Sequence, residues 1–217
     1  LNYLKNNNMK FTFKTEIIPI IIILISVILS GYFYSVFPDQ VPIHWNFQGE
    51  VDNWGSKFMG AFLMPLMAIG MYLLFLILPL IDPKKDKYKQ FNKVYLLFRN
   101  LIILMLFAIY IISSLNALGY KIRVEVWIPF LIGILFIVMG NYFGKIKPNW
   151  FMGIRTPWTL SSDEVWLKTH RLGGKLFMAL GFLLIISPSL PHQSLLFTLI
   201  IPIMIVVMVP VIYSYIL

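Results

Sequence analysis

Few side chains in this sequence are of the types that catalyse reactions or bind metals. Its 217 residues include three histidines, nine Asp and Glu residues and no cysteine. His44, His170 and His192 lie far apart, so no HExxH zinc motif occurs, and neither a GxSxG nucleophile motif nor a GxxxxGK(S/T) phosphate loop is present. Glu164 precedes His170 by a spacing that points the two side chains apart on a helix. We therefore expect no catalytic residue, no metal site and no cofactor.

The composition of the chain predicts that transmembrane helices position these residues. Hydrophobic residues make up 59% of the chain, charged residues 12%, and the mean hydropathy is +0.81. Soluble domains are about 45–50% apolar and about 25% charged, so a soluble globular protein is excluded, and so is a disordered chain. Six apolar segments can each span a bilayer as a helix, which takes about 20 residues. They are residues 17–37, 58–81, 101–118, 126–143, 172–190 and 194–217.

The lysines and arginines indicate the orientation of this predicted all-α, polytopic bundle of six transmembrane helices. With both termini in the cytoplasm, 15 of the 18 Lys and Arg residues fall inside, and Lys57, Lys121 and Arg123 fall outside. Cationic residues of short loops stay on the cytoplasmic side, which predicts an N-in/C-in topology. The net charge of +9 then indicates contact with anionic lipid of the bilayer, not direct nucleic-acid binding.

This topology divides the chain into three parts. Residues 1–16 form a cytoplasmic N-terminal tail, and residues 17–81 form a first helix pair with the external loop 38–57. Residues 82–217 form a four-helix region with the cytoplasmic loop 144–171. No small-residue cleavage site ends the first span, so we expect that span to remain in the protein.

The external loop 38–57 has the pattern of a short β-hairpin. Apolar and other residues alternate over residues 41–48, which is typical of a half-buried strand. Residues 47–49 are expected to turn, and residues 50–54 to pair back. The loop is acidic, since Asp39, Glu50 and Asp52 outnumber Lys57. It is either a rigid cap over the helix ends, which composition alone favours, or an external surface that recognises a cationic or amphipathic ligand.

The first cytoplasmic connection predicts a helix that continues into the third span. Tyr88, Phe91, Tyr95, Phe98 and Ile102 share one face of this helix, with lysines on its other faces. The helix either lies on acidic lipid, which is the favoured alternative, or docks a soluble partner.

The second cytoplasmic connection, loop 144–171, is expected to be irregular over residues 147–159, because Gly, Pro and Asn recur there. Ser161 and Glu164 have the spacing of a capping box, which predicts a short helix over residues 162–171. Gly173 and Gly174 would then permit a bend or a close helix contact before the fifth span.

Several side chains of this loop suit the membrane interface. Trp150, Phe151, Trp158 and Trp166 can anchor the loop at the lipid headgroups. Arg155 could clamp a lipid phosphate or a carboxylate. His170 is expected to be an interfacial residue and not a base.

Two stretches, in this order within a six-span chain, form a specific pattern. The external stretch contains Pro38, Pro42, His44, Trp45, Asn46, Gly49, Asp52, Ser56 and Lys57. The cytoplasmic stretch contains Gly140, Asn141, Lys147, Pro148, Asn149, Gly153, Ile154, Arg155, Thr156, Pro157, Trp158, Thr159, Trp166, His170, Arg171, Gly173 and Gly174. Together they resemble the Sdp immunity (SdpI-type) family, and the resemblance covers residues 38–181.

What the resemblance implies is a bacterial plasma membrane protein that protects its producer against a secreted toxic peptide. The external residues that would bind the peptide or shape the loop are His44, Trp45, Asn46, Gly49, Glu50, Asp52 and Lys57. The family's founding member also transduces a signal, by holding a small cytosolic winged-helix repressor at the membrane. The cytoplasmic motif would hold the bundle or dock such a partner.

A small membrane transporter or exporter of a peptide or lipid-like substrate is the alternative function. Proton-coupled transporters and pumps usually carry Asp, Glu or His within their spans. The central apolar stretches of the six predicted spans contain none of these residues, so this alternative is less favoured. An intramembrane enzyme is the least favoured function, because no nucleophile and base pair is recognisable.

Overall fold

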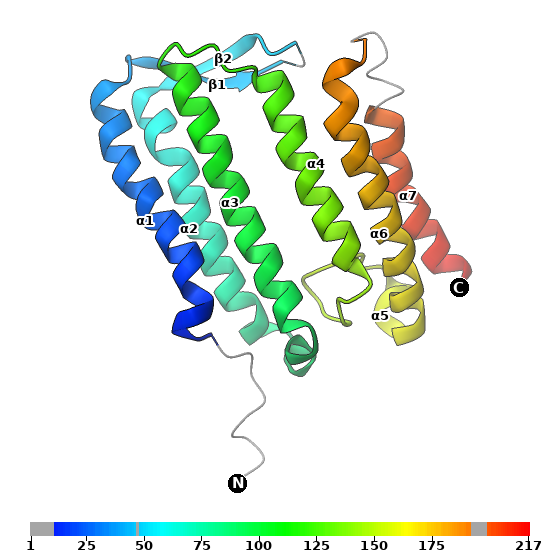
Figure 1. Cartoon of the computed structure of the whole chain (residues 1–217). Helices are drawn as coiled ribbons and strands as arrows, with labels where there is room; N and C mark the ends of the chain where they lie inside the picture. The colour runs from blue at the N-terminus through cyan, green and yellow to red at the C-terminus, as the bar shows by residue number, and fades with distance from the viewer. Residues whose placement is uncertain (1–10, 47, 192–198) are drawn as a thin grey trace.

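Six helices run through the molecule in alternating directions (Figure 1). The computed structural model describes residues 11–46, 48–191 and 199–217. The helices are α1 (Phe13–Val36), α2 (Lys57–Ile81), α3 (Asn92–Ala117), α4 (Val124–Phe143), α6 (Asp163–Ile186) and α7 (Ile201–Ile216). Most of the predicted N-terminal tail, Phe47 of the predicted turn, His192 and the predicted start of the sixth span at Ser194 lie outside the described residues.

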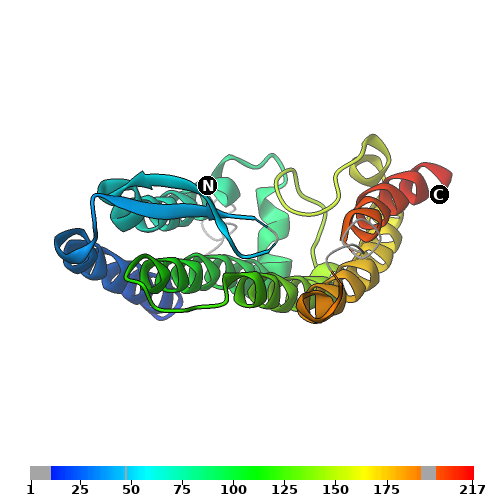
Figure 2. The same ribbon diagram turned by 90° about the horizontal axis from the view of Figure 1, so that it is seen from above.

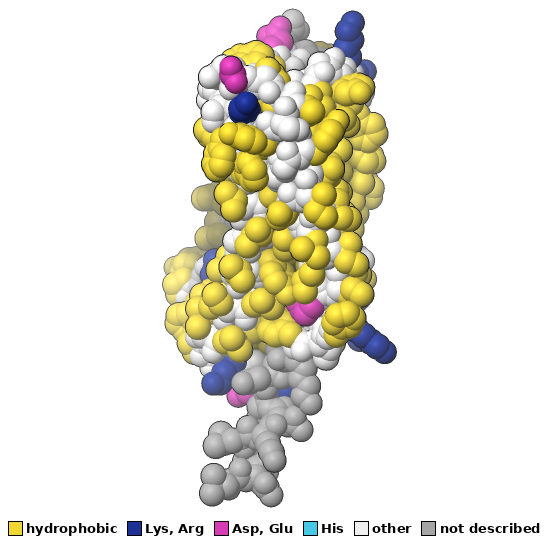
Figure 3. Space-filling model, turned by 90° about the vertical axis from the view of Figure 1, so that its left-hand side faces the viewer, with side chains coloured by type: hydrophobic (Ala, Val, Ile, Leu, Met, Phe, Trp, Pro, Cys, Tyr) yellow, Lys and Arg dark blue, Asp and Glu magenta, His cyan; other side chains and the backbone are white. Residues whose placement is uncertain are grey.

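The lengths and surfaces of these helices fit a bilayer. Five of them, α1, α2, α3, α4 and α6, are long and apolar enough to cross a membrane, and α7 is a shorter apolar helix. Large hydrophobic side chains such as Ile28, Leu66 and Met204 are exposed on their outward faces. Figure 3 shows one face of the molecule, where hydrophobic side chains cover the middle and most charged side chains lie towards the two ends. The predicted polytopic helical membrane bundle is therefore confirmed.

The bundle consists of a three-helix group and a row of three further helices. Helices α1, α2 and α3 pack against one another, α3 packs on α4, α4 on α6, and α6 on α7. The predicted hairpin is confirmed as strands β1 (Gln40–Trp45) and β2 (Val51–Ser56), and it lies over one end of the three-helix group (Figure 2). We call this end of the bundle the hairpin end. The opposite end, where α1 begins and α7 finishes, is the loop end.

The hairpin is anchored by its apolar side chains. Val41 is fully buried and belongs to a cluster with Phe33, Phe37, Ala61 and Tyr110 from all three helices of the group. The predicted alternation is followed in part, since Val41 is buried and His44 is exposed, but Pro42 is also buried and the strand pairing is irregular between Pro42 and Trp45.

Helices α4 and α6 approach each other so closely that their backbones touch. A Cβ atom at Gly140 would lie 2.5 Å from the carbonyl oxygen of Gly174, and one at Gly133 would lie 2.6 Å from that of Gly181. The two glycines of each helix are two turns apart and share one face. Small residues at such positions permit close packing within a membrane, where dispersion contacts replace the hydrophobic effect.

The predicted helix boundaries of loop 144–171 are wrong in two respects. The short helix expected over residues 162–171 is the first part of α6, which continues without a break through Gly173 and into the span. The cap of α6 is Ser162, whose Oγ accepts a 3.3 Å hydrogen bond from the Val165 backbone, and not Ser161. Ser161 instead ends α5 (Pro157–Ser161), a short helix that begins within residues 147–159, which were expected to be irregular. Thr156 caps α5 and Pro157 occupies its first turn, which explains why it forms.

The aromatic face of the first cytoplasmic connection exists, and it is buried in the interior of the bundle. A 3₁₀ helix, η2 (Lys85–Phe91), leads directly into α3. Tyr88, Phe91, Tyr95 and Phe98 are buried in a cluster with Trp166 of α6. These rings therefore join the two parts of the bundle.

Candidate functional site

At the hairpin end, Asn46 organises the turn between the strands. Its Oδ1 atom accepts hydrogen bonds from the backbone N–H groups of Gln48 and Glu50, both at 2.9 Å. Its Nδ2 atom donates to the Glu50 carboxylate at 3.0 Å. Gly49 has a φ of 81°, a conformation that glycine adopts without strain. Asn46 and Glu50 therefore shape the turn, and the side chain of Glu50 is used in doing so.

The side chains of His44 and Asp52 contact each other across the two strands. The His44 Nδ1 atom lies 2.5 Å from Asp52 Oδ1, and both side chains are largely exposed, by 67% and 43%. Trp54, two residues along β2, is 56% exposed. The outward face of the hairpin thus presents an imidazole, a carboxylate and an indole to the surroundings, a set that suits an amphipathic or cationic ligand.

Contacts with distant helices hold the hairpin in place. The indole N–H of Trp45 donates to Asn116 Oδ1 near the end of α3 at 3.3 Å. The side chain of Glu125, from the first turn of α4, lies directly over Gly49, where an added Cβ would meet it. The Nζ atom of Lys57 lies 3.8 Å from Oδ1 of Asp39 at the base of the hairpin. Asn116 and Glu125 were not expected from the sequence, because they lie far along the chain.

At the loop end, Asn149 organises the turn that follows α4. Its Oδ1 atom accepts from the backbone N–H groups of Phe151 and Met152 at 2.9 and 2.6 Å. Its Nδ2 atom donates to the carbonyl oxygens of Lys147 and Met152 at 2.9 and 3.0 Å. The residue has no exposed surface. All four hydrogen bonds of this amide are therefore made inside the protein.

His170 joins this loop to α6, and its expected place at the membrane interface is wrong. The residue is fully buried and stacks on Trp166 with a ring separation of 4.1 Å. Its Nε2 atom accepts from the Ile154 backbone N–H at 2.9 Å, so Nδ1 carries the proton and donates to the Trp166 carbonyl oxygen at 2.8 Å. Gly153 has a φ of 106°, and an added Cβ there would meet the imidazole. His170 is thus a neutral side chain that positions the loop.

Other motif residues also form internal contacts. Trp166, which was expected to anchor at the headgroups, is instead buried and donates from its indole to the Ile146 carbonyl oxygen at 2.8 Å. Thr159 is fully buried and donates to the Ile154 carbonyl oxygen at 3.0 Å. Thr156 lies 2.9 Å from Ser214 of α7, hydroxyl to hydroxyl. The motif therefore ties α4, α6 and α7 together.

Asp82, which the sequence did not single out, links this loop to the first half of the chain. The residue is buried, and its Oδ2 atom accepts from the Tyr88 hydroxyl and from the Trp150 backbone N–H, both at 2.9 Å. Its Oδ1 atom accepts from the Lys84 backbone N–H at 2.7 Å. A buried carboxylate with three donors is well satisfied.

A second buried charge, also missed from the sequence, joins α1 to α3. Arg99 is fully buried and its guanidinium contacts Glu16 at 2.8 Å and the Thr15 carbonyl oxygen at 2.8 Å. Tyr72 of α2 donates to the same carboxylate at 2.9 Å. The only signal in the sequence was that Glu16 and Arg99 both fall near the cytoplasmic ends of predicted spans.

Several motif residues at the loop end remain exposed. Arg155 is exposed, and its guanidinium donates to the Trp150 carbonyl oxygen at 2.7 Å. Trp150 and Trp158 are 48% and 37% exposed. Asn141, Pro157 and Arg171 are exposed, whereas Pro148, Gly173 and Gly174 are buried.

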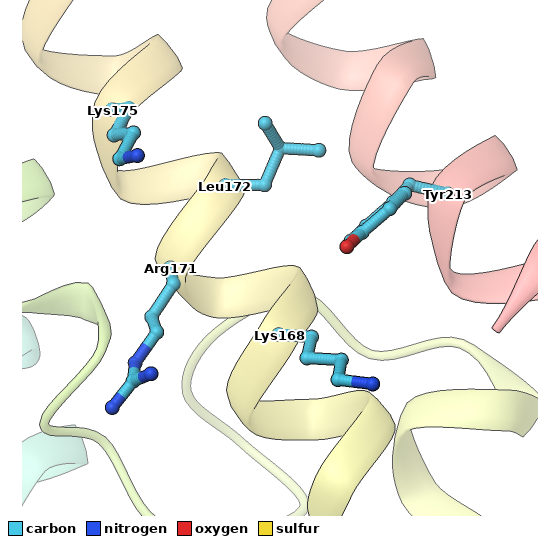
Figure 4. A pocket seen from close by; sticks show the side chains of 5 residues that line it. All are labelled: Lys168, Arg171, Leu172, Lys175 and Tyr213. Atoms are coloured by element: carbon cyan, nitrogen blue, oxygen red, sulfur yellow. The ribbon is translucent and has the colours of Figure 1, made fainter.

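A small basic cavity of about 240 Å³ lies between α6 and α7 at the loop end (Figure 4). It is lined by Lys168, Arg171, Leu172, Lys175 and Tyr213. Lys168 is paired with Glu164 at 2.7 Å. In Figure 4 the guanidinium of Arg171 points away from Tyr213. Glu164 therefore neutralises the charge of Lys168, and the charge of Arg171 lies on the side away from Tyr213.

The polar contacts described at both ends hold loop and turn segments in place. Among residues 11–46, 48–191 and 199–217, no group of three or more His, Cys, Asp and Glu side chains could hold a metal ion. The two most complete polar arrangements, around Asn149 and His170, hold backbone groups of the loop.

Known proteins resemble this chain in both regions. Residues 145–214 match the SdpI/YfhL protein family, and residues 21–69 match a domain of unknown function, DUF1648. The chain is 27% identical over 202 residues to "Immunity protein SdpI" of Bacillus subtilis (strain 168), which covers 93% of this chain and 95% of that protein. No solved structure matches the chain.

The matched regions coincide with the two ends described above. Residues 21–69 contain the hairpin, and residues 145–214 contain nearly all of the loop that Asn149 and His170 organise. The similarity to the Bacillus subtilis protein extends through both of them and through the helices between. The chain is thus a multi-pass protein of the bacterial plasma membrane that is similar to an SdpI immunity protein.

Proposed function

We propose that this chain is a membrane immunity protein that protects its cell against a secreted toxic peptide. The similarity to a Bacillus subtilis immunity protein along 93% of the chain carries the proposal. A likeness of that extent includes the external hairpin as well as the bundle, so it supports a shared mode of action and not only a shared architecture.

In this proposal, the hairpin is the surface that binds the peptide. His44, Asp52 and Trp54 project from it, while Asn46 and Glu50 fix its turn. An aromatic and acidic surface at the membrane interface suits the cationic and apolar side chains of membrane-active peptides. The bundle then serves as the rigid support that holds this surface at the bilayer.

Deletion of the gene in its own host tests the immunity function. The deletion strain should be killed by medium conditioned by the parent strain, and the restored gene should return survival to the parental level. A deletion strain that survives as well as its parent, in medium that kills an unrelated sensitive strain, would contradict the proposal.

The N-in/C-in orientation, on which the hairpin's role depends, can be tested separately. The chain has no cysteine, so single-cysteine variants are simple to interpret. Asn53→Cys lies on exposed β2 and Lys85→Cys is exposed at the loop end. A membrane-impermeant maleimide applied to intact cells should label the first variant and leave the second unlabelled until the cells are opened. The reverse pattern would place the hairpin inside the cell and remove it as a peptide receptor.

A role in signalling, through a cytosolic winged-helix repressor held at the membrane, is the second part of the proposal. The exposed Arg155, Trp150 and Trp158 form the part of the inner loop that a cytosolic protein can contact. Arg155→Ala should reduce co-purification of such a repressor while leaving direct peptide binding by the purified protein unchanged. An equal loss of both would contradict this division between the two ends.

Transport of a peptide or lipid-like substrate is the competing function. It predicts that the protein in liposomes moves labelled peptide across the bilayer, whereas immunity by binding predicts retention without flux. Flux that depends on the protein would favour the transporter.

A further inference from the structure

A second and larger basic cavity lies at the loop end, between the start of α3 and the end of α4. Its volume is about 680 Å³. Lys89 and Lys93 belong to one wall, and Lys145 and Lys147 to the other. None of the described residues that line it is acidic. Four cations gathered around one hollow from two separate chain segments favour an anionic occupant.

The position of this cavity identifies the environment of its ligand. Helices α3 and α4 both span the membrane, and the cavity lies where they leave its apolar core. Tyr142, in the last turn of α4, lines the cavity, and the Lys145 ammonium lies 4.4 Å from the centre of its ring. Aromatic rings and lysines combine in this way at the depth of the lipid headgroups. A basic pocket between transmembrane helices on the cytoplasmic side is the kind of site that binds anionic headgroups.

Asn92 adds a second requirement, a hydrogen-bond donor, which a phosphodiester alone does not supply. Its side chain lines the cavity, and its Oδ1 atom is buried without a hydrogen-bond partner. A buried acceptor that lacks a donor is unfavourable, so a ligand with a hydroxyl group is preferred. For a ligand in the cavity to reach this buried oxygen, the terminal amide must turn so that the oxygen faces the cavity.

We propose that this cavity binds the headgroup of phosphatidylglycerol, with the phosphate among the lysines and a glycerol hydroxyl donating to Asn92. The ligand comes from the surrounding bilayer, since the acyl chains can run along α3 and α4. The smaller cavity beside α7 is a weaker candidate because its volume is only about 240 Å³ and the guanidinium of Arg171 points away from Tyr213. The bound lipid would fix the start of α3 against the end of α4, where the two parts of the bundle meet.

The test measures lipid retained by the purified full chain in detergent, by native mass spectrometry. Four probes distinguish the sources of the ligand. Phosphatidylglycerol has the phosphate and the hydroxyls, phosphatidylmethanol has the same charge without a hydroxyl, phosphatidylcholine has no net charge, and glycerol 3-phosphate has no acyl chains. We expect tight binding of one phosphatidylglycerol, weaker binding of phosphatidylmethanol, and little binding of the other two.

Lysine variants test whether the cavity is the site. Lys93→Gln with Lys145→Gln removes one charge from each wall and should weaken phosphatidylglycerol binding by about tenfold or more. The control, Lys14→Gln with Lys85→Gln, removes two exposed charges that do not line the cavity and should change binding by less than about twofold. Equal losses in both variants would show a general attraction of anionic lipid to a basic protein and would overturn the proposal.

Asn92→Leu tests the hydroxyl. This variant should bind phosphatidylglycerol and phosphatidylmethanol equally, because the orphaned acceptor is gone. A wild-type protein that binds phosphatidylcholine as tightly as phosphatidylglycerol, or that prefers glycerol 3-phosphate, would overturn the proposal even if a variant failed to fold.

Discussion

Two asparagines, one at each end of the molecule, perform the same local task in opposite surroundings. Asn46 in the hairpin and Asn149 in the inner loop each accept two backbone N–H hydrogen bonds through Oδ1 and so close a turn. Asn149 is fully buried and also donates twice to backbone carbonyls, whereas Asn46 is only partly buried and donates to the side chain of Glu50.

The same contrast holds for the residues around them. At the loop end His170, Trp166 and Thr159 are buried and their polar atoms bond within the protein. At the hairpin end His44 and Asp52 pair with each other in the open. Polar motif residues are therefore buried and bonded within the protein at one end and exposed at the other. Burial, and not residue type, separates these two cases.

The change expected to have the largest effect is Gly174→Leu, in the part of the bundle that the inner loop holds together. A Cβ at this position would lie 2.4 Å from the carbonyl oxygen of Gly140, so α4 and α6 must separate. We expect a loss of about 3 kcal/mol or more in the free energy of unfolding, or no folded protein. Thermal unfolding in detergent should show a midpoint lower by about 10 °C.

The matched control is Gly70→Leu in α2, because an added Cβ there has no neighbour within 4 Å. This variant should keep its midpoint within about 2 °C of the parent, since leucine is also a better helix former than glycine. If both leucines were tolerated equally, the close approach of α4 and α6 would not contribute to stability.

The second prediction compares the two asparagines directly. Asn149→Ala removes four hydrogen bonds and leaves buried backbone groups without partners, so the free energy of unfolding should fall by about 3 kcal/mol. Asn46→Ala should cost about 1 kcal/mol, because water can replace the lost contacts at the exposed turn. Chemical or thermal unfolding of both variants in one detergent measures the difference. Equal costs would mean that burial does not distinguish the two ends.

The sequence predicted the architecture and the hairpin well, because both depend on local patterns. Long apolar segments specify helices in a bilayer, and the alternating pattern that begins at Val41 predicts a strand, which the structure places at Gln40–Trp45. The cap of α6 was misplaced by a single residue, from Ser162 to Ser161, since two adjacent serines compete for the same role.

The contacts that make the candidate sites were much harder to predict, because they join distant residues. Arg99 and Glu16 are 83 positions apart, and Trp45 and Asn116 are 71 apart. The burial of His170 depends on the loop folding back so that Ile154 donates to it, which no local pattern specifies. A polar residue in a motif therefore predicts that something is bound, but whether the partner is backbone or ligand follows only from the fold.

The smallest effect on stability, and the sharpest test of the comparison, is expected for the pair of His44 and Asp52. Exposed ion pairs contribute about 0.2–1 kcal/mol, so His44→Ala, Asp52→Ala and the double variant should all unfold close to the parent. Their coupling energy in a double-mutant cycle should likewise stay below about 1 kcal/mol.

If the hairpin recognises the toxic peptide, the same variants should nevertheless reduce survival of cells in conditioned medium, at unchanged protein levels in the membrane. Asp163→Ala with Lys87→Ala, an exposed ion pair of 3.4 Å at the loop end, is the matched control and should leave survival intact. If cells with the hairpin variants are fully protected, His44 and Asp52 do not recognise the peptide. The pair would then have only a structural role, like the buried network at the other end, and the peptide would bind elsewhere on the protein.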